Sequence, residues 1–278
     1  MQVIVYTADN ESENNVLRAF YDGCEADKDI RDLDHYETSD VAVVFGTFKK
    51  QIPVSYRRGN VVYQQKARGK DVVILETGYI FRGAGESNYY AAGLNGLNGR
   101  ADFKNEGSKP DRALQLVERG LQVKPWRESG THILLCGQVP WDASVDHIDF
   151  LKWAEATADM LSAKTQRPIV YRPHPLAKTP APRGTTLSTN RRLDEDLVDC
   201  WCVVTFSSNS GVDAALNGIP VVAMDEGSMV KSITTNIASI ENPKMPSRAN
   251  WLSDIAYAQW TPQEMREGLA WKHLFQST

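Results

Sequence analysis

The sequence predicts an α/β protein of doubly wound architecture, built from two Rossmann-like domains. Seven apolar runs recur along the 278 residues, with helical intervals between them. The runs are continuous and rich in β-branched residues, as expected of strands buried on both faces of a parallel sheet. Hydrophobic residues make up 42% and charged residues 24% of the chain, which is ordinary globular composition. This composition excludes a disordered chain.

The elements follow from periodicity and capping residues. The helical period predicts helices at 148–161 and 211–219. A third helix is predicted at 261–274, because Thr261 suits the N-cap, Pro262 the first helical position and Glu264 the end of a capping box. The candidate strands are 2–7, 41–45, 71–75, 132–136, 168–172, 202–206 and 219–224. Alternation of this kind indicates sheets covered by helices.

The stretch 104–130 marks the predicted change of domain. Glycines and prolines gather there around one short amphipathic segment, and a second strand–helix series begins after it. We therefore divide the chain into domains at 1–128 and 129–260, followed by a C-terminal helix at 261–278.

Several features predict a cytoplasmic protein without a membrane span. The first residues lack the basic segment of a signal peptide, and no apolar run approaches the ~18 residues of a spanning helix. The cysteines, Cys24, Cys136, Cys200 and Cys202, form no CxxC pair, so buried reduced thiols are the simplest interpretation. We expect a monomer or a weak dimer.

Charge is distributed unevenly, although the net charge is only −4. Residues 1–40 hold eleven acids against three bases, whereas residues 41–70 hold seven bases and no acid. A dense basic stretch can attract an anionic partner through its local potential. The alternative is a solvated hairpin that merely lacks acids, and both interpretations stay open at this stage.

The stretch 197–225 combines a buried strand, a serine-rich loop and a helix start. The loop, Ser207-Ser208-Asn209-Ser210-Gly211, would lie at the carboxyl end of the strand, where open α/β sheets bind ligands. Hydroxyls and free N–H groups at such a helix start suit a phosphate, and Gly211 would allow close approach. In the alternative interpretation, Ser208 or Ser210 only caps the helix.

Two further strands end in polar, turn-rich loops. The strand at 168–172 leads into Arg-Pro-His-Pro, in which Arg172 can bind a phosphate and His174 can protonate a leaving group. The strand at 132–136 leads into a loop whose Gly137, Gln138 and Ser144 can complete the site. We expect the three loops to lie together at one edge of the sheet.

These segments resemble a known superfamily. A strand followed by SSNSG, a helix and NGIPVV, with RPHP upstream, is similar to the donor domain of GT-B glycosyltransferases, especially the capsule-polysaccharide and glycerophosphate-transferring branches. A wider set of segments resembles bacteriophage proteins that glycosylate hydroxymethylated pyrimidines in DNA, and it covers most of residues 70–275. The set is LNGLNGRADF (94–103), ILLCGQVPWDASV (133–145), RPHP and GVDAALNGIPVVAMDEGSMV (211–230).

The resemblance implies a GT-B-like fold, with two parallel sheets facing across a cleft and a C-terminal helix that crosses back to the N-terminal domain. It implies an acceptor-binding N-terminal domain and a C-terminal domain that binds a nucleotide sugar. Asp213 would meet the ribose hydroxyls or, alternatively, only stabilise a helix N-terminus. The residues implied at the donor phosphates are Gly137, Gln138, Ser144, Arg172, His174, Ser208, Asn209, Ser210 and Gly211.

Beyond the nucleotide sugar, which is a substrate, the resemblance implies neither a cofactor nor a metal. GT-B enzymes stabilise the leaving diphosphate with helix dipoles and basic residues. The triplets 27–29 and 194–196 match a metal-binding DxD pattern only formally.

An acceptor hydroxyl requires a general base, preferably a carboxylate at a strand end. Glu76 directly follows the strand at 71–75 and is the favoured candidate. Asp9 and Asp102 are alternatives, and His174 is the candidate acid. Direct displacement would invert the anomeric centre, whereas a retaining mechanism would need no such base, and both stay open.

In the DNA interpretation, basic side chains of the N-terminal domain neutralise phosphates while tyrosines stack on an exposed base. The alternative is that Tyr56, Tyr63, Tyr89 and Tyr90 pack on their own sheet. The predicted DNA contacts are Lys49, Lys50, Arg57, Arg58, Lys66, Arg68, Arg82 and Arg100.

The leading hypothesis is a hexosyltransferase that modifies phage DNA in the host cytoplasm. By default it transfers glucose from UDP-glucose to a hydroxymethylpyrimidine, with hydroxymethylcytosine favoured over hydroxymethyluracil. The first alternative is a glycosyl- or glycerophosphate-transferase that acts on a capsule or cell-envelope polymer. Further alternatives are a nucleotide-sugar epimerase and a non-catalytic nucleotide- or DNA-binding accessory protein.

Overall fold

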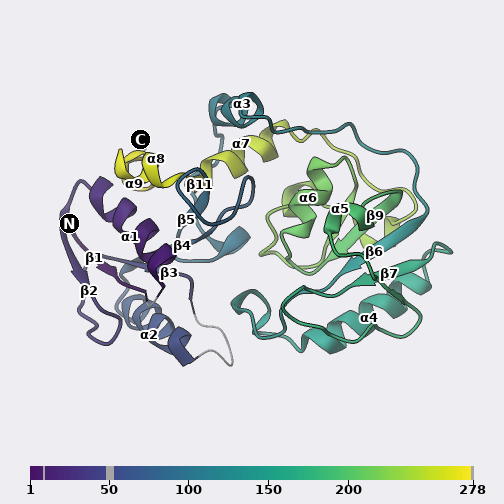
Figure 1. Ribbon diagram of the computed structural model, residues 1–278, viewed down its shortest axis with the longest axis horizontal. Helices are drawn as coiled ribbons and strands as arrows, with labels where there is room; N and C mark the ends of the chain where they lie inside the picture. The colour runs from purple at the N-terminus through teal and green to yellow at the C-terminus, as the bar shows by residue number, and fades with distance from the viewer. Residues whose placement is uncertain (9, 48–52, 277–278) are drawn as a thin grey trace. The chain divides into compact units, whose positions relative to one another are not determined.

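The computed structural model describes the chain except residues 9, 48–52 and 277–278, and it consists of two compact units (Figure 1). Unit 1 comprises Met1–Arg112 and Leu252–Thr278, and unit 2 comprises Ala113–Trp251. Each unit has its own sheet, so the predicted pair of Rossmann-like domains is confirmed.

Unit 1 is built on a sheet of six strands in the order β11-β5-β4-β3-β1-β2. Strands β2, β1, β3 and β4 are parallel, whereas β5 is antiparallel to β4, and β11 to β5. The antiparallel edge was not predicted, but such an edge is common on parallel sheets. The bounds are β1 Gln2–Tyr6, β2 Asp27–Arg31, β3 Val41–Phe45, β4 Asp71–Thr77, β5 Tyr90–Leu94 and β11 Gln259–Trp260.

Helices cover both faces of this sheet. On one face, Val3 and Val5 share a buried cluster with Phe20 of α1 and Trp271 of α9. On the other face, Ile4 belongs to a cluster that contains Val61 of α2. Alternate residues of one strand thus meet different helical layers, which explains the continuous apolar runs. The helices are α1 Glu11–Gly23, α2 Pro53–Ala67, α8 Pro262–Arg266 and α9 Leu269–Phe275.

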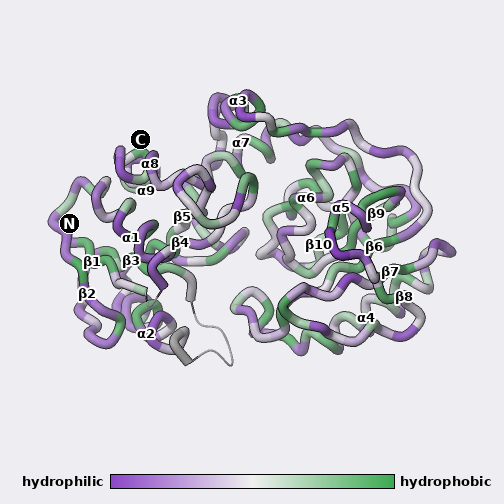
Figure 2. Tube along the Cα trace, in the orientation of Figure 1, coloured by the Kyte–Doolittle hydropathy of each residue, from purple (hydrophilic) through white to green (hydrophobic). Residues whose placement is uncertain are grey.

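Unit 2 contains a sheet of five strands in the order β10-β9-β6-β7-β8, all parallel. Apolar residues run along β6 and β9, as the colouring in Figure 2 shows. The strands are β6 His132–Cys136, β7 Ile169–Arg172, β8 Thr186–Leu187, β9 Cys200–Thr205 and β10 Val221–Ala223. The helices are α4 Phe150–Ser162, α5 Leu193–Asp196 and α6 Ser210–Leu216, while α3 Asp111–Glu118 and α7 Ala249–Tyr257 span the unit boundaries.

Four short 3₁₀ turns complete the elements in the described part of the chain: Asn98–Arg100, Ala143–Val145, Lys231–Ile233 and Ile237–Ser239. None of the helices there is long and apolar enough to cross a bilayer. All four cysteines are buried and unpaired.

The C-terminal segment belongs to unit 1, as the resemblance implied, but the chain returns within α7 rather than at residue 261. The predicted helix at 261–274 is divided into α8 and α9, because Gly268 between them adopts a left-handed conformation with φ 78°. The predicted capping box is present, with the Thr261 and Glu264 side chains each accepting a backbone N–H of the other.

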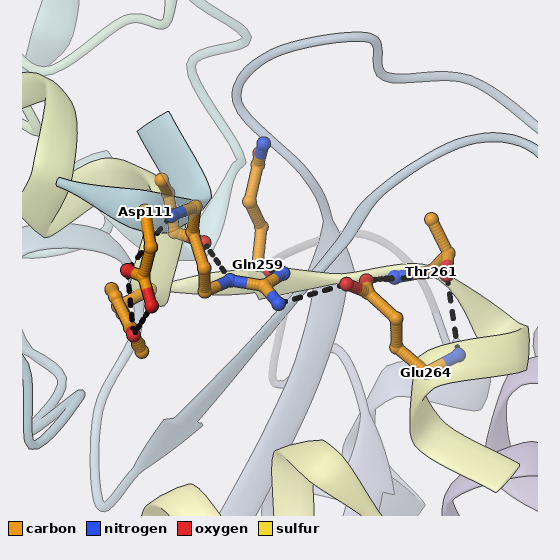
Figure 3. Close-up of polar contacts among 7 residues, drawn as sticks. Asp111, Gln259, Thr261 and Glu264 are labelled. Atoms are coloured by element: carbon orange, nitrogen blue, oxygen red, sulfur yellow. Dashed lines mark hydrogen bonds and ion pairs between the residues drawn. The ribbon is translucent and has the colours of Figure 1, made fainter. Parts of the chain in front are cut away.

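Arg112 fastens this segment to the rest of unit 1 by hydrogen bonds to Gln259 and Glu264, which are labelled in Figure 3. Its buried guanidinium donates to Ala256 O at 3.0 Å, Gln259 O at 3.0 Å and Glu264 Oε1 at 2.8 Å. The guanidinium carbon also lies 3.9 Å from the centre of the Trp260 ring. Each guanidinium nitrogen of Arg112 therefore has an acceptor on the C-terminal segment.

The first unit boundary lies inside α3, whereas the glycine- and proline-rich stretch suggested residue 128. The chain after α3 packs on unit 2: Lys124 N donates to Leu216 O at 2.9 Å, and Trp126 Nε1 to Pro246 O at 2.8 Å. These contacts explain why an irregular, turn-rich segment still belongs to unit 2.

Candidate functional site at the carboxyl edge of unit 2

Polar side chains follow four strand ends along the carboxyl edge of the unit 2 sheet. Gln138 follows β6, His174 follows β7, Ser207 follows β9 and Asp225 follows β10. These strands are parallel neighbours, so their carboxyl ends form one edge. Edges of this kind are where open α/β sheets bind ligands.

Gln138 joins the loops after β6 and β9. Its Oε1 accepts Ser207 N at 2.7 Å, while its Nε2 donates to Ser207 Oγ at 3.2 Å and to Ser144 Oγ at 3.3 Å. Ser144 in turn donates to Asp142 Oδ1 at 3.0 Å. The structure therefore brings these predicted residues together, with Gln138 holding the loops in place.

Gly137 is required by the close approach of β7. A Cβ at this position would lie 2.7 Å from Tyr171 Oη and 3.2 Å from Arg172 O. Gly137 N also donates to Arg172 O at 2.7 Å. The glycine therefore lets two strand ends lie side by side.

Most polar groups of the serine-rich loop form hydrogen bonds within the loop and the first turn of α6. Ser208 Oγ accepts Ser210 N at 3.2 Å, as in the capping alternative. The N–H groups of residues 211–213 donate to backbone oxygens of Ser208 and Asn209, which leaves them occupied. Ser210 Oγ is buried near the Cys136 thiol.

Gly211 and Asp213 occupy the first turn of α6. A Cβ on Gly211 would lie 3.0 Å from Val230 Cγ2, so packing explains this glycine. Asp213 is half-buried in the same turn, where an acidic residue suits the helix dipole.

His174 has a defined tautomer. Its Nδ1 accepts Leu176 N at 3.1 Å, so the proton of the neutral ring resides on Nε2. Partial burial lowers the pKa of His174, against the opposing effect of the Asp142 charge. At neutral pH the ring is therefore uncharged, with Nε2–H as a donor at the sheet edge.

Arg172, the predicted phosphate ligand, is engaged inside the protein. Its Nη1 lies 2.5 Å from Asp196 Oδ2, with side-chain exposures of 11% and 3%, and its Nη2 donates to Arg191 O at 3.1 Å. Asp196 also accepts Ser188 Oγ at 2.7 Å and Asn190 Nδ2 at 2.7 Å. A phosphate would have to displace these contacts, so in this structure Arg172 braces the end of β7.

The same edge carries a pair of residues that the sequence analysis missed. His147 Nε2 lies 3.6 Å from Asp225 Oδ2. The two residues are 78 positions apart in the sequence but close in space, because the loop after β6 and the loop after β10 share this edge. No local spacing signals such a pair, although each residue follows a predicted strand.

The candidate bases of unit 1 do not form one group. Glu76 lies at the carboxyl end of β4, where its Oε1 accepts Thr77 N at 3.0 Å. Asp102 is bridged to Leu94, whose partner Val73 lies toward the other end of β4. Partial burial raises the pKa of Asp102, but hydrogen bonds from Lys104 outweigh this effect and lower the pKa overall. Asp9 lies outside the described residues.

In its described residues the basic stretch forms strand β3 and helix α2 rather than a hairpin, and acids of residues 1–40 contact it. Arg57 lies 2.9 Å from Asp34, Arg58 lies 2.5 Å from Glu13, and Lys70 lies 2.7 Å from Asp40. Three of the seven bases of this stretch are thus paired with acids of residues 1–40.

The other predicted DNA contacts are dispersed. Lys66 donates to Asn95 O at 2.6 Å, Arg68 to Gln64 O at 2.8 Å and Arg82 to Tyr79 O at 3.1 Å. Arg100 closes a 3₁₀ turn next to Asp102, and Lys49 and Lys50 lie outside the described residues. Of the tyrosines, Tyr89 and Tyr90 are buried, whereas Tyr56 and Tyr63 are exposed.

Neither DxD triplet presents its carboxylates together for a metal. Asp29 forms an ion pair with Arg31, and Asp196 is bound by Arg172. Within the part of the chain that the structure describes, no group of three or more His, Cys, Asp or Glu residues is arranged to hold a metal ion.

The comparisons with known proteins identify a fold. No protein-family model and no curated protein matches the chain. Its structure is similar to that of the Thermosulfurimonas dismutans KpsC beta Kdo 2,7 transferase, with a TM-score of 0.56, 15% identity and coverage of 97% of this chain and 99% of that chain. The structure is also similar to that of the KpsC beta Kdo 2,4 transferase of the same organism. Here the TM-score is 0.56 and the identity 16%, with coverage of 93% of this chain and 90% of that chain.

The chain therefore has a GT-B-like fold of two Rossmann-like domains, shared along nearly its whole length with two sugar transferases. This likeness agrees with the capsule-transferase side of the sequence resemblance. It lends no support to the phage DNA side.

Proposed function

We propose that the chain is a glycosyltransferase that transfers a sugar from a nucleotide-activated donor to a hydroxyl group of a capsule or other cell-envelope glycan. The observation that carries the proposal is the neutral His174, whose Nε2–H donor stands at the carboxyl edge of the unit 2 sheet. The choice of acceptor follows the full-length similarity in fold to two Kdo transferases.

In this proposal, unit 2 binds the donor and His174 donates its Nε2–H to a phosphate oxygen. The bond between the anomeric carbon and that phosphate breaks, and the leaving group keeps the electron pair. His174 stabilises the developing negative charge. The clamp formed by Gln138 and Ser207 keeps the neighbouring loops in place for binding.

Unit 1 binds the acceptor in this proposal. The acceptor oxygen forms the new bond to the anomeric carbon, and its proton passes to a base. Glu76 is the candidate base, because it stands at the carboxyl end of β4, whereas the ion pair with Lys104 makes Asp102 unsuitable. A second route, transfer to DNA, is less favoured, since Arg57, Arg58 and Lys70 have acidic partners inside unit 1.

The test is mass spectrometry of acceptors after incubation with uridine-, guanosine-, cytidine- and thymidine-linked sugars. Short envelope oligosaccharides form one arm, and DNA that contains hydroxymethylcytosine or hydroxymethyluracil forms the other. We expect a mass gain of one sugar on an oligosaccharide and none on DNA. A gain on DNA alone would restore the phage hypothesis, and a donor converted to its epimer would replace transfer by epimerisation.

A further inference from the structure

Arg58 of helix α2 is a nearly buried cation of unit 1 that has no part in the mechanism above. Its side chain is 11% exposed, and its Nη2 lies 2.5 Å from Oε2 of Glu13, in the first turn of α1. The Nε atom is buried and has no hydrogen-bond partner among the described residues. Buried donors are normally paired, so a guanidinium with an unused buried donor indicates a role beyond one ion pair.

The other terminal nitrogen of Arg58, Nη1, lies at the carboxyl edge of the sheet. A Cβ on Gly46, the residue after β3, would lie 3.1 Å from Nη1 and 3.7 Å from Glu76 Oε2. The guanidinium and the carboxylate thus approach the same point. The two atoms are less than about 7 Å apart, a distance at which opposite charges interact where water is scarce.

Backbone contacts fix this arrangement. Gly46 N donates to Leu75 O at 2.7 Å, so the end of β3 is held against the residue that precedes Glu76. Glu76 Oε1 accepts Thr77 N at 3.0 Å, and Oε2 is the oxygen that lies toward Gly46. Gly46 adopts φ 68°, where glycine is favoured, and lacks a side chain that would separate the guanidinium from the carboxylate.

Charge explains what Arg58 can contribute at this edge. Carboxylates that approach one another without a cation repel, and one of them then tends to hold a proton. A guanidinium that pairs with Glu13 and faces Glu76 offsets this repulsion, and a base must be ionised to accept a proton. The planar fork also fixes direction, because Nη1 and Nη2 point to different carboxylates.

We propose that Arg58 is a positioning residue for the transfer reaction, and that its guanidinium holds the Glu76 carboxylate in the orientation that accepts the acceptor's proton. The inference rests on the proposed function, because it takes Glu76 to be the base. The proton of the acceptor hydroxyl passes to Glu76, and the guanidinium keeps its own protons throughout.

The test is a double-mutant cycle on kcat, measured with the oligosaccharide and the nucleotide sugar that give the largest mass gain. Arg58→Gln removes the charge but can still donate to Glu13, and Glu76→Gln removes the base. The matched control is Arg57→Gln, which alters the neighbouring pair with Asp34. Arg58→Lys keeps the charge without the fork and serves if Arg58→Gln fails to fold. Circular dichroism shows whether each variant is folded at the assay temperature.

We expect Arg58→Gln to lower kcat roughly tenfold when Glu76 is present, with an unchanged KM for the acceptor, and to have no further effect in Glu76→Gln. Arg58→Lys should lower kcat about threefold, again only when Glu76 is present. The control Arg57→Gln should keep the kcat of the wild type.

A purely structural role for Arg58 would give equal losses with and without the Glu76 carboxylate. That result, or an unchanged kcat in Arg58→Gln, would overturn this inference alone. Full activity of Glu76→Gln would remove the base and the inference with it. A wild type that transfers no sugar to any oligosaccharide would overturn the proposed function as well.

Discussion

At the residue scale, the backbone beside His174 decides its chemistry. The N–H of Leu176 donates a hydrogen bond to Nδ1, and partial burial lowers the pKa of His174. The ring therefore presents one donor. Because this contact involves only residues next to the two prolines, His174 could be predicted as a site residue without a structure. The partner of Arg172, by contrast, lies 24 residues away, and no local pattern shows that Asp196 engages it.

Replacing His174 tests its assigned role. We expect His174→Asn to lower transfer roughly 100-fold, because it keeps an acceptor for Leu176 N but removes the Nε2–H donor. His174→Gln, which can place an amide donor near that position, should lose less. Both rates are measured with the donor at saturation. Equal activity of wild type and His174→Asn would remove His174 from the site.

At the element scale, burial explains only part of what could be predicted, because β5 is buried along its whole length and was still missed. Strands β3 and β9 are buried along their whole length, so their apolar runs identify them. Strand β2 reads Asp-Lys-Asp-Ile-Arg and lies at the sheet edge with little burial, so it carries no hydrophobic signal. Strands β8 and β11 have two residues each, too few for any period.

The brace between β7 and α5 can be measured by a double-mutant cycle. We expect Asp196→Leu to cost about 3 kcal/mol of unfolding free energy, because it leaves the Arg172 charge buried without its partner. Arg172→Met combined with Asp196→Leu should cost less than the sum of the single variants. Denaturant unfolding gives all four values. If Arg172→Met instead weakened donor binding and left stability unchanged, Arg172 would be a phosphate ligand.

Helix α9 makes stability depend on pH. Burial lowers the pKa of His273, a hydrogen bond to Phe103 O at 2.8 Å raises it, and the Arg112 charge lowers it, with a net decrease. Below pH ~6.5, the unfolded chain therefore binds more protons at this residue than the folded chain, and stability falls as pH decreases. Above that pH, the contribution is constant.

We expect His273→Gln, which can still donate to Phe103 O, to reduce the fall in melting temperature between pH 7 and 5. Part of the fall should remain, because the lowered pKa of His174 acts in the same direction. Thermal denaturation followed by circular dichroism gives both curves. Parallel curves for wild type and variant would show that His273 does not titrate in this range.

At the scale of the whole molecule, some acids and bases that are separated along the sequence form ion pairs in space. Helix α2 carries three of the seven bases, Arg57, Arg58 and Lys66, and acids of residues 1–40 lie beside it in unit 1. A net charge calculated along the chain cannot distinguish this arrangement from a nucleic-acid surface, because the partners come from different elements. The pair of His147 and Asp225 escaped prediction for the same reason, since it forms only when two strand ends meet.

Two neighbouring arginines of α2 allow the last prediction to be tested within one helix. The pair of Arg58 and Glu13 is largely buried, with side-chain exposures of 11% and 21%, whereas Arg57 and Asp34 are exposed to 35% and 59%. We expect Arg58→Gln to cost about 2 kcal/mol of unfolding free energy, because the Glu13 carboxylate loses its partner where water is scarce. Arg57→Gln, the matched control, should change stability by less than about 0.5 kcal/mol. Denaturant unfolding measures both, and DNA binding at several salt concentrations provides the second readout. Two variants of native stability that both weaken salt-dependent DNA binding would show that these arginines serve a nucleic acid instead of the fold.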